Sequence, residues 1–208
     1  MDFIKEACVD TVKDAVHAFN SGADRIEFCS NLDEDGLTPK TDDLILIKKL
    51  VSIPIRVMIR PHSKSFVYNE MDIETMKNTI DLCKQYDFDG VVFGCLNRDN
   101  ELNMNLIKDL ANYAKPLNVI IHKAIDITLS PIESLKKLIK LKTINGVLSS
   151  GGAANAEMGS STLKQMVELS PKNFEIIVAG KVTNVNLELI HKKIGSSFYH
   201  GRKIVGEL

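Results

Sequence analysis

The feature that most constrains the fold is a regular alternation between short strand-like runs and longer segments of helical period. Eight runs are apolar or alternate apolar with polar residues, as strands do. Between them stand seven segments with apolar residues at steps of three or four, such as Ile73, Met76, Ile80 and Cys83. The predicted strands are 4–8, 25–29, 55–59, 90–93, 119–122, 146–149, 175–179 and 197–200, and the predicted helices are 11–20, 42–50, 73–86, 104–114, 131–141, 161–169 and 185–194.

This alternation favours an α/β fold in which crossover helices join parallel strands. A closed (β/α)8 barrel of the TIM type explains the number of strands best. An open doubly wound sheet is the alternative, but its strands are buried on both faces and should be continuously apolar. Several of the predicted strands instead carry polar residues at every second position. We predict one domain, 1–208, that is shorter than the typical barrel of about 250 residues and lacks the eighth helix.

Composition argues against several functional classes. The formal net charge is −1, with acidic and basic residues interspersed, so no basic surface for nucleic acid is expected. The N-terminus lacks a signal peptide pattern, and apolar runs such as 44–47 are far shorter than the ~20 residues that span a bilayer. Four cysteines without C-x-x-C spacing indicate free thiols in a reducing compartment. We therefore predict a cytoplasmic protein that binds neither nucleic acid nor membrane.

Polar residues gather at the carboxyl ends of the first three strands, on the face where barrel active sites lie. Glu6 and Cys8 share one face of the first strand, and Glu27 and Cys29 share one face of the second. Adjacent strands are about 4.8 Å apart, so the two carboxylates can approach each other and so can the two thiols. Such a carboxylate pair needs a counter-charge, and Arg60 is its predicted partner. The pair is either a catalytic acid and base or a buried ion-pair network that fills the barrel.

The thiols and the histidine at the strand ends each allow two interpretations. Cys8 and Cys29 could bind Cu(I) together, because thiolates suit that ion, or they could be small core residues. His122 ends the fifth strand and could donate a proton or bind a ligand near neutral pH. Asp126 could hold the tautomer of His122 or act alone. The alternative is a hydrogen-bonded histidine that only fills space.

Two glycine-containing turns follow the sixth and seventh strands. Backbone amides there could hold an anion, and serine hydroxyls could add donors. Late loops of this fold commonly bind phosphate, although tight turns need glycine in any case. The candidate anion-binding residues are Ser150, Gly151, Gly152 and Gly180.

A series of short motifs runs through nearly the whole chain in a fixed order. They are GADRIEFCSN at 22–31 with GLTP at 36–39, VMIRP at 57–61 with FVY at 66–68, GVVFG at 90–94, HKAID at 122–126, SSGG at 149–152 and AG at 179–180. With these motifs the chain resembles the CutC copper-homeostasis family. The resemblance implies a (β/α)8 barrel, a cytoplasmic location and a role in handling copper. It also implies that Cys8 and Cys29 are candidate copper ligands, beside a polar barrel mouth of Glu27, Arg60, His122 and Asp126.

The chain departs from the family pattern at several places. Lys123 stands where the family usually has arginine, and 62–65 replaces an Arg-Gly-Gly-Asp run. The glycine-rich run around Lys181 is thinned, and family members continue past the position of Gly206. The resemblance therefore does not extend to any activity that depends on those loops or on that tail.

Two functional hypotheses follow from these observations. The first is a cytosolic protein that binds and handles Cu(I) through Cys8 and Cys29. The second is an enzyme acting on a small polar or phosphorylated metabolite, with Glu27 and His122 transferring protons and Arg60 holding substrate charge. A barrel that binds a ligand or partner without turnover is a third possibility. Because the absent eighth helix would expose apolar surface, we also predict a homodimer or a larger homo-oligomer.

Overall fold

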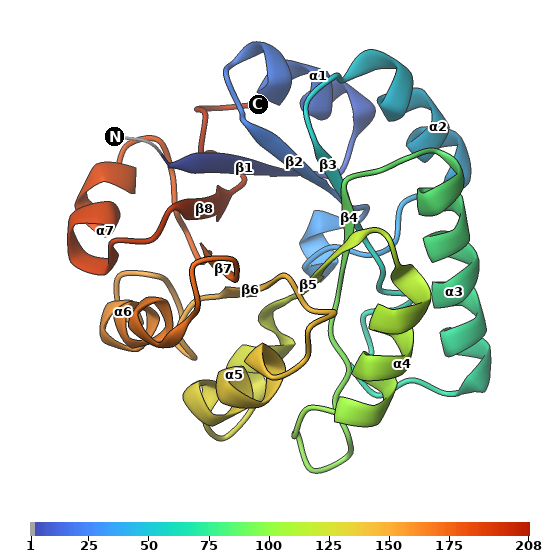
Figure 1. Cartoon of the computed structure of the whole chain (residues 1–208). Helices are drawn as coiled ribbons and strands as arrows, with labels where there is room; N and C mark the ends of the chain where they lie inside the picture. Colours follow the sequence, from blue (N-terminus) through green and yellow to red (C-terminus); the bar gives the residue numbers. More distant parts are fainter. Residues whose placement is uncertain (1–2) are drawn as a thin grey trace.

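The barrel is closed by hydrogen bonding between its first and last strands (Figure 1). The computed structural model describes residues 3–208, and within them all eight strands are parallel and pair in chain order. The predicted (β/α)8 barrel is therefore confirmed. The strands are β1 Ile4–Val9, β2 Arg25–Phe28, β3 Ile55–Met58, β4 Gly90–Phe93, β5 Asn118–Ile121, β6 Gly146–Ser149, β7 Glu175–Val178 and β8 Phe198–Gly201.

Helices alternate with the strands and lie around the outside of the barrel (Figure 1). Two short 3₁₀ helices lie after β2 and β5, on the side of the barrel where the strands end. Within residues 3–208, no helix is both long and apolar enough to cross a bilayer. The helices are α1 Val12–Asn20, η1 Leu32–Glu34, α2 Thr41–Leu50, α3 Glu70–Gln85, α4 Met104–Ala114, η2 Lys123–Ile127, α5 Pro131–Ile139, α6 Ser160–Leu169 and α7 Leu187–Ile194.

Capping side chains set the first residues of several helices. The helix α3 begins at Glu70, three residues before the prediction, because Asn69 and Asp72 form a reciprocal capping box. Ser130 caps α5, and Pro131 occupies its first turn as predicted. Apolar periodicity thus predicts the body of a helix, whereas a polar first turn carries no apolar period and is missed.

The two faces of the strands contribute to different parts of the interior. Outward-facing residues pack against the helices and form the main core, while charged residues Arg25, Arg56 and Glu175 lie inside the barrel near the strand starts. The polar residues at every second position of the predicted strands therefore point into the interior of a closed barrel. Nearer the strand ends, the interior contains a smaller apolar cluster of Cys8, Cys29, Met58, Val92, Ile120, Leu148, Ile177 and Ala179.

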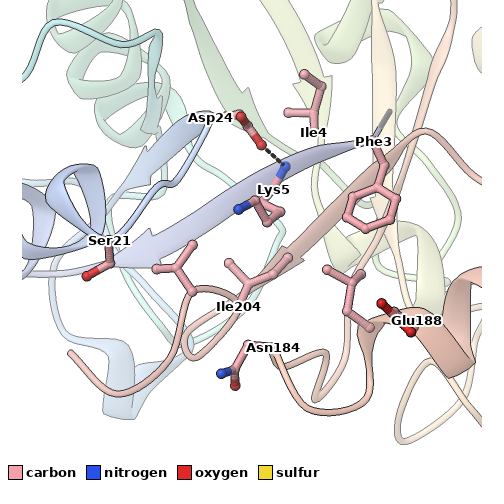
Figure 2. A pocket seen from close by; sticks show the side chains of 10 residues that line it. Phe3, Ile4, Lys5, Ser21, Asp24, Asn184, Glu188 and Ile204 are labelled. Atoms are coloured by element: carbon pink, nitrogen blue, oxygen red, sulfur yellow. Dashed lines mark hydrogen bonds between the residues drawn. The ribbon is translucent and has the colours of Figure 1, made fainter. Parts of the chain in front are cut away.

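The region beside β1 and β8 is only partly covered. Among residues 3–208 no α-helix follows β8, and the buried Ile204 packs against the main core from the segment after that strand. A groove of about 710 Å³ remains next to it (Figure 2). Its lining comes from β1, the segment between α1 and β2, the start of α7 and the segment after β8. Its apolar lining is Phe3, Ile4, Leu187, Ile204 and Val205.

Candidate functional site

A cavity of about 860 Å³ lies at the carboxyl ends of the strands, where we predicted the functional face. Cys8, Glu27 and His200 line it from β1, β2 and β8. Arg60 and His122, which follow β3 and β5, line another part, and the loops after β6 and β7 complete the wall. Small-molecule sites typically occupy about 300–1,000 Å³. The cavity is therefore large enough for a metabolite as well as for an ion.

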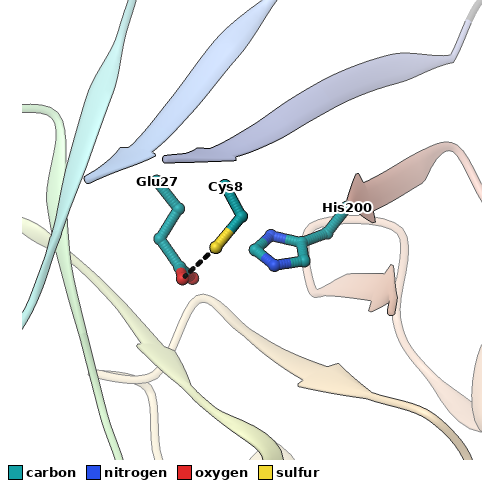
Figure 3. Close-up of side chains that lie close together, drawn as sticks. All are labelled: Cys8, Glu27 and His200. Atoms are coloured by element: carbon teal, nitrogen blue, oxygen red, sulfur yellow. Dashed lines mark hydrogen bonds between the residues drawn. The ribbon is translucent and has the colours of Figure 1, made fainter. Parts of the chain in front are cut away.

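Cys8, Glu27 and His200 form a compact buried group, which we call the Cys8 cluster (Figure 3). One donor atom from each residue lies within 4.8 Å of the donor atoms of the other two. Cys8 Sγ lies 3.8 Å from Glu27 Oε1. The parallel register sets Cys8 beside Glu27, and closure of the barrel brings β8 alongside β1. A sulfur, an imidazole nitrogen and a carboxylate oxygen thus converge from three strands.

Glu6 supports the Cys8 cluster from within the barrel. Its Oε1 lies 2.8 Å from Nδ1 of His200, and its Oε2 accepts from Arg25 Nε at 2.5 Å. Burial acts to raise the pKa of Glu6, but Arg25 and His200 outweigh burial and hold that pKa well below its usual range. Burial acts to lower the pKa of His200, but Glu27 and Cys8 outweigh it and raise that pKa well above its usual value. Anionic Glu6 therefore pairs with Nδ1 of His200 and fixes the orientation of its ring.

The other two members of the Cys8 cluster hold their protons more tightly than usual. Burial, opposed by His200 and reinforced by Glu6, raises the pKa of Glu27 to about 7. The pKa of the Cys8 thiol is raised well above its usual value, first by its contact with the Cys29 sulfur and then by burial. In addition, Glu27 Oε2 is buried without a hydrogen-bond partner. A cation that bound here would therefore displace protons from these groups.

The Cys29 thiol is a neighbour of Cys8, as predicted, but it is not one of the three converging donors. Its Sγ contacts the Val9 carbonyl oxygen at 3.4 Å. It also packs against Gly36, where a Cβ atom would lie only 3.2 Å from Sγ. The two cysteines thus lie together at the barrel mouth, and their joint binding of an ion stays a prediction.

The prediction that Arg60 neutralises the buried carboxylates is wrong. Arg25 pairs with Glu6, and a second guanidinium inside the barrel, that of Arg56, donates to both carboxylate oxygens of Glu175 at 2.7 and 2.9 Å. Arg25 Nη2 also lies 3.1 Å from Glu175 Oε2. Arg60 stands beyond the end of β3, above this network, and its guanidinium bonds only to backbone carbonyls.

Arg60 and His122 meet around one aromatic ring. Arg60 Cζ lies 4.9 Å from the centroid of the Phe66 ring, and the His122 ring lies 4.8 Å from the same centroid. Nδ1 of His122 accepts a hydrogen bond from the Ala124 amide at 3.1 Å. Burial, followed by the charge of Arg60, lowers the pKa of His122 to about 3. The imidazole is therefore neutral near pH 7, with its proton on Nε2.

Among the described residues Asp126 forms no hydrogen bond with His122, contrary to the prediction that it holds the histidine tautomer. The 3₁₀ helix η2 directs its carboxylate toward the loop after β6. There it accepts hydrogen bonds from the Ser149 hydroxyl at 2.5 Å, the Ser150 amide at 2.8 Å and the Gly152 amide at 2.9 Å. Asp126 therefore stabilises that loop.

The loop at 149–152 contributes to the cavity wall together with Gly180. Two of the loop amides already donate to Asp126, and the Gly151 amide donates to the Ser149 hydroxyl at 2.8 Å. An external anion would have to compete with the Asp126 carboxylate for two of these donors. Anion binding by this loop stays a prediction, with its strongest donors engaged internally.

Several important side chains were not among the predicted site residues. His200 stands at the end of a predicted strand, but its position beside Cys8 depends on closure of the barrel. Arg25 and Arg56 occupy strand positions whose side chains point into the barrel. The alternation of each strand was the only sequence pattern that could have indicated them. Glu175 begins its strand and gave no signal, because its partners are distant in sequence.

A sequence model of the CutC family matches residues 3–205. The human copper homeostasis protein cutC homolog is 38% identical over 198 residues, which cover 95% of this chain and 72% of the human protein. A relative of the same name from Dictyostelium discoideum is 34% identical over 223 residues, covering 94% of this chain and 80% of that protein.

Solved structures agree with the sequence comparison. A CutC protein from Streptococcus agalactiae superposes with a TM-score of 0.91 at 26% identity, covering 97% of this chain and 99% of that one. N-acetylneuraminate lyase from Mycoplasma synoviae has a TM-score of 0.66 at 14% identity, covering 98% and 70%, and shares the fold alone. On the family match and these identities, the chain belongs to the CutC family.

Proposed function

We propose that this protein acts in copper homeostasis by binding Cu(I) at the barrel mouth, with Cys8 and Cys29 as ligands and His200 as a third donor. The carrying observation is the convergence of the Cys8 sulfur and the His200 imidazole within 4.8 Å, next to a second buried thiol. The names of the human and Dictyostelium relatives support a copper role.

The chemistry of the donors fits a soft monovalent ion. Thiolate and thioether ligands select Cu(I) over hard divalent cations. The thioether of Met58 lies with the two thiols in the smaller apolar cluster inside the barrel. The bond from Glu6 to His200 Nδ1 resembles the outer carboxylate that commonly orients a metal-binding histidine. The carboxylate oxygen of Glu27 is a hard ligand, so it would bind Cu(I) more weakly than the two sulfur atoms do.

Titration of the fully reduced protein against a chromophoric Cu(I) chelator, without oxygen, tests the proposal. We expect one equivalent to bind, with release of protons because the Cys8 thiol is protonated in the free protein. Cys8→Ser and His200→Gln should each weaken binding at least tenfold. Cys83→Ala is the matched control, since that thiol is buried in α3 away from the mouth, and it should bind as the unmodified protein does.

Circular dichroism spectra identify variants that fail to fold. If the Cys8→Ser, Cys29→Ser double variant folds and still binds one equivalent with unchanged affinity, the proposed ligands are incorrect.

Location and self-association complete the proposal. A cytoplasmic location agrees with four free cysteines among the described residues.

Self-association is supported by the apolar lining of the groove beside β1 and β8 and by the exposed Val185 and Leu189 near it. We expect light scattering to give at least twice the monomer mass, and Leu189→Lys, which changes an exposed side chain of α7, to lower it. A monomer mass at micromolar concentration would contradict self-association.

A further inference from the structure

Arg60 is a buried cation without an anionic partner. Only 6% of the residue is exposed, and among residues 3–208 it takes part in none of the ion pairs. Its Nη1 donates to the carbonyls of Glu34 and Gly36 at 2.8 and 3.0 Å, which orients the guanidinium, and its Nε has no hydrogen-bond partner. Of the nearby acids, Glu34 interacts with the charge of Arg60 but is exposed, and Asp35 lines the same cavity but is also exposed. A buried cation that lacks a counter-charge is costly, which points to an external anion.

His122 offers a second unused donor in the same place. The residue is 4% exposed and lines the cavity, and its Nε2 is buried with no partner. Because Nδ1 accepts from the Ala124 amide, Nε2 carries the proton and can only donate. The ring is held closely, since a Cβ atom at Gly94 would lie 2.7 Å from it. Two donors are therefore fixed in position around Phe66.

The surrounding charge also favours an anion. Lys123, Lys181 and Arg202 line the cavity, and Lys181 holds its backbone at φ +57°, a conformation that non-glycine residues rarely adopt. Of the three acids in the lining, Asp126 accepts from the loop after β6, Asp35 is exposed, and Glu27 belongs to the Cys8 cluster, where burial raises its pKa to about 7. A concave surface of one predominant charge concentrates ligands of the opposite charge.

We infer that the barrel mouth binds a small organic anion, a carboxylate or a phosphate, whose oxygens accept from Arg60 Nε–H and His122 Nε2–H, with the lysines of the rim adding charge. Charge-assisted hydrogen bonds of this kind are the strongest that a neutral ring and a guanidinium can make. The donors belong to the segments after β3 and β5, whereas the Cys8 cluster belongs to β1, β2 and β8. The anion site is thus independent of the proposed copper ligands.

Calorimetric titration with inorganic phosphate and with malonate tests this inference and separates the two sources of the anion. We expect one of the two probes to bind at a single site with millimolar or better affinity in low-chloride buffer. His122→Asn retains an acceptor for the Ala124 amide and removes the Nε2 donor, so it should weaken binding at least tenfold. Arg60→Lys retains the charge and loses the Nε donor geometry, and should also weaken it. Arg98→Met removes an exposed charge elsewhere and should change nothing.

A second measurement does not depend on the variants. In nitrogen-15 spectra of the unmodified protein, the effective probe should shift one neutral histidine among the five in the chain. Absence of binding by both probes, or equal binding by His122→Asn and the unmodified protein, would overturn the inference. The Cys8→Ser, Cys29→Ser variant should still bind the anion, so the outcome is read separately from the copper proposal.

Discussion

Replacing Arg56 by methionine is expected to lower the free energy of unfolding by about 3–5 kcal/mol, the loss typical when one partner of a buried ion pair is removed. Arg56 is 2% exposed and donates to both carboxylate oxygens of Glu175 and to Asp89 Oδ2 at 2.9 Å. Without it, Glu175 retains only Arg25 as a cationic partner, at 3.1 Å. Urea unfolding monitored by circular dichroism gives the free energy directly.

Two further variants show whether the loss comes from the ion pair itself. Arg56→Lys keeps the charge but cannot bond both carboxylate oxygens in the plane of a guanidinium, so its loss should be smaller. The double variant Arg56→Met, Glu175→Met leaves no unpaired charge at these two positions and should lose less than the sum of the two single variants. A single-variant loss below about 1 kcal/mol, the range of exposed pairs, would show that the network is not effectively buried.

Acidification should destabilise the protein through His122. The pKa of this residue is about 3 in the folded chain against 6.5 for an unperturbed histidine, so below pH 6.5 the unfolded chain binds the proton more readily. The contribution of His122 is fully present above pH 6.5 and decreases as the pH falls toward 3. At pH 5 the loss amounts to about 2 kcal/mol, from 1.36 kcal/mol per pKa unit.

The measurement compares the unfolding free energy at pH 7 and pH 5 in the unmodified protein and in His122→Asn. Glu27 acts in the opposite direction, because its raised pKa adds stability as the pH falls, but it does so equally in both proteins. The variant should therefore be less sensitive to acid by about 2 kcal/mol. His17→Asn changes an exposed histidine of α1 and serves as the control. Equal acid sensitivity in all three proteins would mean that His122 is accessible to solvent protons.

The sequence predicted the barrel and the side chains that point into it, because both depend on local patterns. Glu27 and Cys29 were found from the alternation of their strand. The pairing inside the barrel was not predictable in the same way, because Glu175 reaches Arg56 across 119 positions of the chain. Arg60 was therefore assigned to Glu6 and Glu27, whereas Arg25 pairs with Glu6 and, among the described residues, Glu27 takes part in no ion pair.

Closure of the barrel and local loop geometry explain the remaining differences. His200 joins Cys8 only because β8 pairs with β1, and that closure cannot be read from a single strand. Asp126 lies four residues after His122, yet η2 directs its carboxylate to the next loop. Such short helical turns leave little periodic signal in a sequence.

The charged network at the strand starts has a further consequence for how a bound ion would exchange with solvent. Arg25, Arg56 and Glu175 fill the interior on the side opposite the mouth, and none of the three lines the cavity. An ion that bound at Cys8 would therefore exchange with solvent through the barrel mouth, which Arg60 and His122 also line. An anion bound at Arg60 and His122 would then slow the exchange of that ion, without any contact between the two ligands.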